Sequence, residues 1–172
     1  MKQTTDHQIF CYTDEGNPSN GAWVDLDGIT DLETAQDHLK EQGFGLYDDI
    51  KVLEAKGFAR HFHDIKAHTF DLYGYMAFAE VPDHIPEEAL EAFIEWQGLN
   101  NALANLDSFE DAYVGEYPSR SDFAREIMGE KVANLDPDPD LVIDWEETAN
   151  MLDVGDYHIE EVNDAHYAFR NM

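Results

Sequence analysis

The stretch EEALEAFIEWQ, residues 87–97, has the clearest helical pattern in the chain. Leu90, Phe93 and Ile94 repeat at helical spacing along one side, and Gly98 follows as a stop signal. Three acids that we expect to face solvent are spaced four residues apart with no base between them: Glu87, Glu91 and Glu95. Like charges at this spacing oppose helix formation by about 0.2–0.5 kcal/mol per pair, so helix stability alone does not explain the segment.

Acidic stripes recur further along the chain. In a helix expected over residues 121–130, acids again occupy every fourth position, with Arg125 beside them: Asp122, Glu126 and Glu130. A helix expected over residues 142–152 has a similar set around its start: Asp140, Asp144 and Glu147. A solvated face or an adaptation to high salt produces the same pattern, so the stripes alone leave these interpretations and a functional surface open.

The whole chain is strongly acidic, and its charge is unevenly spread. Its 172 residues include 38 acids and 10 bases, a formal net charge of −28. Two windows without a base, between Lys66 and Arg120 and between Lys131 and Arg170, contribute 22 of those charges. Such a surface repels nucleic-acid backbones and anionic membranes and attracts basic proteins. An aromatic content of 12% nevertheless indicates a folded chain and not a disordered acidic one.

The patterns around residues 87–97 predict an α+β protein. Before them we expect three short strands, and a helix that begins at Thr30, which has capping-box spacing to Glu33. The expected strands are residues 8–12, 22–26 and 49–55. Residues 68–105 are helical in pattern, with a proline-bracketed break at 82–86. After the two later helices, a closing hairpin is expected over residues 157–162 and 166–170.

No catalytic or metal-binding motif stands out. The sequence contains no glycine-rich phosphate loop, no G-x-S-x-G elbow and no H-E-x-x-H helix. The single cysteine, Cys11, lies in an expected strand and is interpreted as a packed residue. His61 and His63, on one face of an extended segment near Asp64 and His68, have ligand-type side chains for zinc, although surface imidazoles are the simpler interpretation. We therefore expect no enzyme activity, no cofactor and no metal.

The sequence also carries no sign of membrane insertion or export. No apolar run follows Lys2, so no signal peptide is visible. The most apolar stretch, residues 72–79, is far shorter than the roughly 20 residues that a membrane span needs. A soluble cytoplasmic protein is therefore expected.

Three segments resemble motifs of the ArdA-type antirestriction proteins. GAWVDL, residues 21–26, is similar to the family's G-x-W-[IV]-D-L segment. Residues 109–124, FEDAYVGEYPSRSDFA, resemble its F-x-D-x-Y-x-G-E-Y-x-S-x-x-D-F-A signature, the most specific of the three. The end of the chain, from LVIDW at 141–145 to YAFR at 167–170, is similar to the family's ending. Residues 44–105 match only in helical character and acidity.

The resemblance implies a protein carried by mobile DNA that imitates duplex DNA and occupies the DNA-binding cleft of type I restriction–modification enzymes. It implies an elongated chain of three small domains: an N-terminal α+β domain at 1–60, a helical middle domain at 61–103 and a C-terminal α+β domain at 104–172. The last domain would form a homodimer, because residues 135–144 are similar to the family's antirestriction motif. The dimer residues expected there are Leu135, Leu141, Val142 and Ile143.

Twelve acids are then expected to form the DNA-like surface: Glu87, Glu91, Glu95, Asp107, Glu110, Asp111, Glu116, Asp122, Glu126, Glu130, Asp144 and Glu147. Their partner would be the cleft of the restriction enzyme, not nucleic acid or a membrane. Three other interpretations stay open. The first is mimicry aimed at another DNA-binding protein, the second a salt-adapted acidic protein without mimicry, and the third a metal-dependent hydrolase built on His61, His63 and Asp64.

Overall fold

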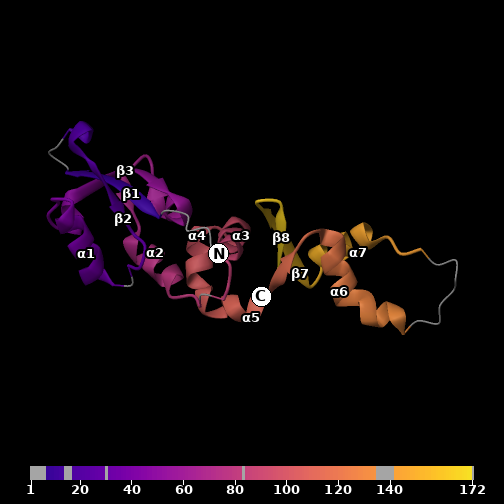
Figure 1. The fold of residues 1–172 in the computed structure, drawn as a ribbon. Helices are drawn as coiled ribbons and strands as arrows, with labels where there is room; N and C mark the ends of the chain where they lie inside the picture. Colours follow the sequence, from indigo (N-terminus) through magenta and orange to yellow (C-terminus); the bar gives the residue numbers. More distant parts are fainter. Residues whose placement is uncertain (1–6, 14–16, 30, 83, 135–141, 172) are drawn as a thin grey trace. The chain divides into compact units, whose positions relative to one another are not determined.

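A computed structural model (Figure 1) describes residues 7–13, 17–29, 31–82, 84–134 and 142–171. The protein is α+β, as expected, and divides into two compact units, Met1–His84 (unit 1) and Ile85–Met172 (unit 2). The segment 61–103, expected to be a separate domain, is divided between these units, so the three-domain layout is not confirmed. Within the described residues, no helix is long and apolar enough to cross a membrane.

Unit 1 is built on a three-stranded antiparallel sheet in the order β2-β1-β3. Its strands are β1 (Gln8–Thr13), β2 (Ala22–Asp25) and β3 (Ile50–Lys56), which confirms the three expected strands. Alternate side chains enter the core, among them Ile9 and Cys11 of β1. Burial raises the pKa of the Cys11 thiol to about 12, so this cysteine is a packed residue and not a nucleophile.

Two helices lie on one side of this sheet (Figure 1): α1 (Leu32–Glu41) and α2 (Leu72–Ala79). The expectation that α1 is capped by Thr30 is wrong, because Asp31 is the N-cap: its Oδ1 accepts a hydrogen bond from the backbone N of Thr34 at 2.7 Å. Thr30 itself lies outside the described residues. Asp and Thr both cap helices well, so the sequence alone does not choose between these two neighbours.

Short elements link the strands and helices of unit 1: η1 (Pro18–Asn20) lies between β1 and β2, η2 (Tyr47–Asp49) between α1 and β3, and η3 (Gly57–Phe62), β4 (His63–Asp64) and β5 (Thr69–Phe70) between β3 and α2. They correct two expectations, because His61 lies in η3 and not in an extended segment, and the helix expected from His68 begins only at Leu72. Aromatic rings from η3 and α2 pack edge to face, with centroids 5.4–5.8 Å apart: Phe58, Phe62, Tyr75 and Phe78.

Gly21, the first residue of the 21–26 motif, leaves room for a neighbouring ring. A Cβ atom at this position would lie 2.5 Å from the carbonyl O of Cys11 and 2.5 Å from the ring of Phe10. The next residues alternate between the two faces of the sheet: Val24 is buried in the core, whereas Trp23 packs edge to face against Phe10 on the other side. Glycine at this position therefore lets the ring of Phe10 lie close to the backbone on the outer face of the sheet.

Gly21→Ala is expected to destabilise the protein by about 1–3 kcal/mol, because the added methyl overpacks a site walled by backbone. The matched control is Gly129→Ala, inside α6 (Arg120–Ala133), where a Cβ meets nothing within 4 Å. That change is expected to stabilise the protein by up to about 1 kcal/mol, since alanine is the better helix former. Urea unfolding measures both, and equal stability of Gly21→Ala and the wild type would contradict this account of the motif.

Unit 2 contains a second antiparallel sheet, in the order β6-β8-β7. Its strands are β6 (Tyr113–Tyr117), β7 (Tyr157–Val162) and β8 (Ala165–Arg170). The expected closing hairpin is confirmed as β7 and β8, which are joined by Asn163 and Asp164 at φ values of 52° and 65°. Asn and Asp adopt this left-handed conformation more readily than most residues, which explains their place in the turn.

Six helical segments complete the described part of unit 2: α3 (Glu87–Gln97), α4 (Leu99–Ala104), η4 (Leu106–Ser108), α5 (Phe109–Ala112), α6 and α7 (Trp145–Val154). As predicted, α3 ends at Gly98, whose φ of 75° suits glycine. α3 packs on β7, and Phe169 of β8 lies among rings of this part of the core. α6 and α7 pack together around a second buried group that includes Phe123 and Ala149.

Candidate acidic interaction surface

The acidic charge is concentrated in unit 2. This unit carries 22 acids and 4 bases, a net charge of −18, whereas unit 1 carries 16 acids and 6 bases, a net charge of −10. The two units are of similar length, so unit 2 has almost twice the net charge per residue. All twelve acids expected to form the partner surface belong to unit 2.

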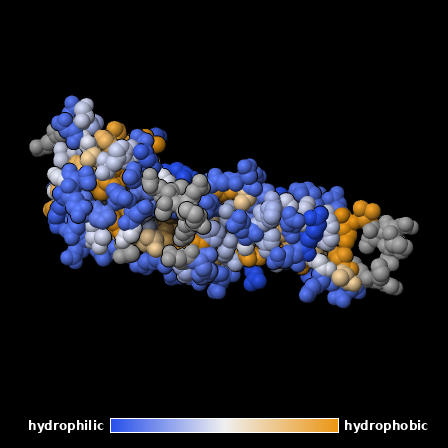
Figure 2. All heavy atoms as spheres, in the orientation of Figure 1, coloured by the Kyte–Doolittle hydropathy of each residue, from blue (hydrophilic) through white to orange (hydrophobic). Residues whose placement is uncertain are grey.

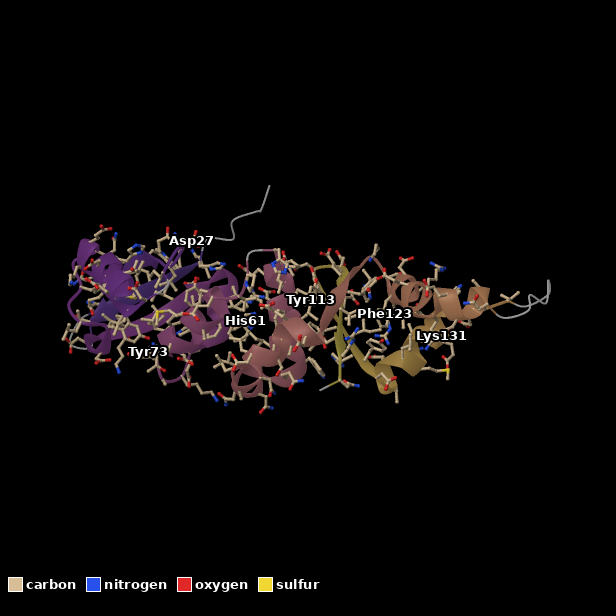
Figure 3. The ribbon with its side chains drawn as sticks, turned by 90° about the horizontal axis from the view of Figure 1, so that it is seen from below. Asp27, His61, Tyr73, Tyr113, Phe123 and Lys131 are labelled. Atoms are coloured by element: carbon tan, nitrogen blue, oxygen red, sulfur yellow. The ribbon has the colours of Figure 1, made fainter. Side chains whose placement is uncertain are left out.

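Most of these twelve acids face solvent. Figure 2 shows hydrophilic residues over most of the visible surface, and Figure 3 shows oxygen-tipped side chains along the outside of the ribbon. Two of the twelve are partly exposed, Glu87 and Asp122. Nine are exposed: Glu95, Asp107, Glu110, Asp111, Glu116, Glu126, Glu130, Asp144 and Glu147.

The expectation that Glu91 faces solvent is wrong, because this residue is only 5% exposed. Residues 89–94 of α3 are all buried, since α3 packs on β7 and is followed directly by α4, which packs against it. Tyr167 lies close by: burial raises the pKa of its hydroxyl well above the ordinary value, and carboxylates that include Glu91 add to the shift. The carboxylate of Glu91 is therefore not part of the outer surface, where α3 contributes chiefly Glu95.

Asp122 caps α6. Its Oδ2 accepts a hydrogen bond from Ser119 Oγ at 2.7 Å, and its backbone N donates to the same Oγ at 3.1 Å. Nη1 of Arg125 lies 2.9 Å from Oδ1 of Asp122. Because this carboxylate is already engaged within the helix, it is a weaker candidate for contact with a partner than Glu130 of the same stripe.

Glu126 also has a partner inside unit 2. Its Oε1 accepts a hydrogen bond from the hydroxyl of Tyr117 at 3.2 Å. Burial, with the carboxylate of Glu126 adding to it, raises the pKa of Tyr117 to about 12, so the hydroxyl remains a donor at neutral pH. Glu126 is nevertheless exposed and keeps its second carboxylate oxygen for solvent or a partner.

The acids at the start of α7 stabilise that helix. The structure begins α7 at Trp145, not at residue 142 as expected, because Asp144 is its N-cap: Oδ1 accepts a hydrogen bond from the backbone N of Glu147 at 3.0 Å. Glu146 and Glu147 lie in the first turn, where negative charge interacts favourably with the helix dipole. These exposed acids therefore have a structural role in addition to any role in binding.

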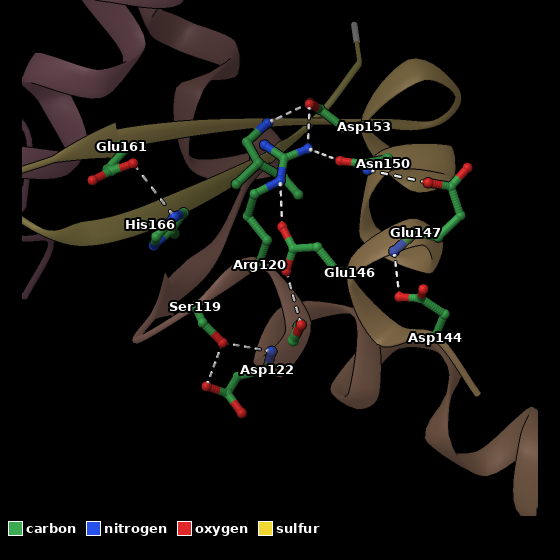
Figure 4. A network of polar contacts seen from close by, with 12 residues as sticks. Ser119, Arg120, Asp122, Asp144, Glu146, Glu147, Asn150, Asp153, Glu161 and His166 are labelled. Atoms are coloured by element: carbon green, nitrogen blue, oxygen red, sulfur yellow. Dashed lines mark hydrogen bonds and ion pairs between the residues drawn. The ribbon is translucent and has the colours of Figure 1, made fainter. Parts of the chain in front are cut away.

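Two of the four bases of unit 2 are engaged by its own carboxylates. Arg120 Nη2 lies 2.8 Å from Asp153 Oδ2, and its Nε lies 3.8 Å from Glu146 Oε1, as the network in Figure 4 shows. Arg125 pairs with Asp122, as described above. Arg120 thus helps to hold α6 to α7, and Arg125 pairs with Asp122 in the first turns of α6.

The four residues expected at a dimer contact are only partly described. Leu135 and Leu141 lie outside the described residues. Val142 is 88% exposed, an unusual environment for valine, and Ile143 is partly buried. An exposed apolar side chain next to the start of α7 is compatible with a protein contact there.

The members of the histidine cluster make separate contacts. Nε2 of His63 lies 2.9 Å from the carbonyl O of Val52, and Oδ1 of Asp64 accepts hydrogen bonds from two backbone N atoms of the following turn. The ring of His68 stands edge-on to Tyr12. Among the residues that the structure describes, no group of three or more His, Cys, Asp or Glu side chains is arranged to hold a metal ion.

Four exposed acids of unit 2 were not among the expected twelve: Glu146, Asp156, Glu161 and Asp164. They lie outside the i, i+4 helical stripes, in a helix start, a strand and two turns. The base-free window between Lys131 and Arg170 contains all four, so charge density was a better guide to them than helical spacing.

No family model, curated protein or solved structure matches this chain.

Proposed function

We propose that this protein imitates duplex DNA and competitively occupies the DNA-binding cleft of type I restriction–modification enzymes, without catalysis. The observation that carries the proposal is the surface of unit 2, on which thirteen of the described acids are exposed and one, Glu91, is buried. Cleft bases that bind phosphates would meet carboxylates there instead. The choice of a type I enzyme rests on the resemblance of residues 21–26 and 109–124 to the ArdA-type motifs.

The charge density of unit 2 supports imitation of DNA. B-DNA carries one negative charge per roughly 1.7 Å of helix axis, so a net charge of −18 corresponds to about 31 Å of duplex. A compact unit of 88 residues has a radius of gyration of about 12 Å, equivalent to a sphere about 31 Å across. Unit 2 therefore has about the net negative charge of a B-DNA duplex as long as the diameter of the unit, and unit 1 has about half of that charge.

The difference between the units favours mimicry over salt adaptation. Acids that serve only hydration would be needed at similar density on both units, yet the net charges are −18 and −10 for similar lengths. The ion pairs of Arg120 point the same way, because they hold one of the four bases of unit 2 partly buried against α7.

A homodimer formed near Val142 and Ile143 would extend the imitation. Two copies of unit 2 carry a net charge of −36, which matches about 61 Å of duplex. The exposed side chain of Val142 supports this part of the proposal.

Phage plating tests the proposed function. Unmodified phage is plated on cells with and without a type I restriction system, each with and without expression of the protein. We expect expression to restore plating on restricting cells and to change nothing on cells without the system. Unchanged restriction in expressing cells would refute the proposal for type I enzymes, and a growth defect in both hosts would point to another DNA-binding target.

A further inference from the structure

The sheet of unit 1 has one face that the described helices do not cover. Pairing places Phe10 of β1 opposite Trp23 of β2 and opposite Glu54 of β3. Because side chains alternate across a strand, these residues lie on the face opposite to the buried Ile9 and Val24, and α1 and α2 lie on the buried side (Figure 1). We call this surface the outer sheet face.

The outer sheet face is aromatic at its centre. The rings of Phe10 and Trp23 meet edge to face at 5.4 Å, and Tyr12 stands edge-on to His68 at 6.3 Å. All four residues are partly exposed. Gly21 leaves room for the ring of Phe10, as shown above. Tyr and Trp are enriched where proteins bind other proteins, because they bury a large area with few rotatable bonds.

The charges of the outer sheet face differ from those of the rest of the protein. Nζ of Lys56 lies 3.7 Å from the centroid of the Trp23 ring, and Lys51 pairs with Tyr12 across the strands. With Asp25 and Glu54, the face carries two bases and two acids. Residues 51–66 hold four of the ten bases of the chain against two acids, so this region interrupts the acidic surface.

The outer sheet face is too small to bind a partner alone. Three strands of up to six or seven residues cover roughly 14 by 20 Å, or about 300 Å². Stable interfaces bury about 800 Å² per partner. A second contact with the same partner would supply the remainder, because linked sites bind with a high effective concentration.

We propose that the outer sheet face docks on a protein surface of the enzyme whose DNA-binding cleft the acids of unit 2 occupy, a deepening that rests on the proposed function. The two bases and two acids of the outer sheet face cancel, so a phosphate-binding cleft gains no net attraction from it, and we place the docking surface outside the cleft. Its chemistry is an apolar centre that receives Phe10 and Trp23, with carboxylates at the rim that pair with the two lysines and bases that pair with Asp25 and Glu54.

Reversing the charge of Lys56 tests the docking contact, because binding through the cleft alone and docking of the outer sheet face predict opposite changes in affinity. Lys56→Glu makes the chain more acidic, so a chain bound only through a basic cleft would bind the purified type I enzyme more tightly. Docking on a carboxylate rim predicts binding about tenfold weaker. The matched control is Lys40→Glu on α1, which makes the same change of charge away from this face. It is expected to leave the affinity unchanged or slightly higher.

Circular dichroism checks that each variant is folded. If Lys56→Glu does not fold, Lys56→Gln, which only removes the charge, replaces it in the test. Weaker binding of the Lys56 variant, with Lys40→Glu unaffected, supports the inference. Equal or tighter binding of the Lys56 variant, or equal losses in both, overturns it and leaves the proposed function standing. A wild-type protein that does not bind the enzyme overturns the proposed function and, with it, this inference.

Discussion

Neutralising four neighbouring acids of unit 2 is expected to weaken binding to a type I restriction–modification enzyme strongly. The variant combines Asp107→Asn, Glu110→Gln, Asp111→Asn and Glu116→Gln, all at exposed positions. In counterion-release terms, each charge that faces a base contributes about 0.9 to the slope of log affinity against log salt. Relative to 1 M salt, this slope makes each such charge worth about fourfold in affinity at 0.2 M salt. We therefore expect the variant to bind about 20-fold more weakly if two of the four acids face the cleft, and about 300-fold more weakly if all four do.

The control for this variant removes the same number of charges from exposed acids of unit 1: Glu33→Gln, Glu41→Gln, Asp48→Asn and Asp49→Asn. It is expected to cost less than tenfold, because the proposed mimic surface lies on unit 2. Titration calorimetry at two or more salt concentrations measures both affinities and both slopes. Equal losses in the two variants would show that net charge alone attracts the enzyme and would contradict a DNA-like surface on unit 2.

Phe169→Ala is expected to destabilise the protein by about 3–5 kcal/mol. Phe169 is fully buried, and its ring lies among four others at centroid distances of 5.5–6.2 Å: Phe93, Trp96, Phe109 and Tyr113. These rings join α3, α5, β6 and β8, so the cavity left by alanine affects every layer of this part of unit 2. Such a loss is a large fraction of the total stability of a typical domain.

Tyr73→Ala is the matched control for the loss of an aromatic ring. Tyr73 lies on α2, is labelled in Figure 3 and is 64% exposed, so its replacement is expected to change stability by less than about 0.5 kcal/mol. Urea unfolding followed by circular dichroism measures both variants. A stability of Phe169→Ala within 1 kcal/mol of the wild type would contradict the central role of this aromatic cluster.

Hydrophobic periodicity predicted much of the fold. The strands β1, β2 and β3, the helix α3 with its stop at Gly98, and the closing hairpin all follow from alternation or helical spacing. The strand β6 was missed, because its pairing with β8 contains a register shift between Tyr113 and Gly115 that interrupts alternation. The start of α1 was misplaced by two residues, because Thr30 and Asp31 are neighbours that both cap helices well, and the starts of α2 and α7 were placed four and three residues too early.

The acids of the candidate surface were predicted from charge and spacing. The prediction was wrong or incomplete where packing buries an acid or engages it in a hydrogen bond. Spacing put Glu91 on the same side of α3 as Glu87 and Glu95, but the buried arc of α3 is wide enough to include it. The width of that buried arc depends on how β7 and α4 pack against α3. The spacing of residues within α3 gives no information about these contacts, because β7 is distant in the sequence and α4 follows α3. The hydrogen bond of Asp122 with the N-cap residue Ser119, and the role of Asp144 as the N-cap of α7, are not distinguished from solvent exposure by spacing alone.

Competition with DNA tests the central claim most directly. Purified type I enzyme is bound to a labelled, unmodified duplex, and the protein is added at several salt concentrations. The account predicts complete displacement of the duplex at each concentration and an association constant that falls as salt rises, by about 0.9 in log–log slope for each acid that faces a base. A complex that holds duplex and protein together, or an association constant independent of salt, would contradict imitation of DNA.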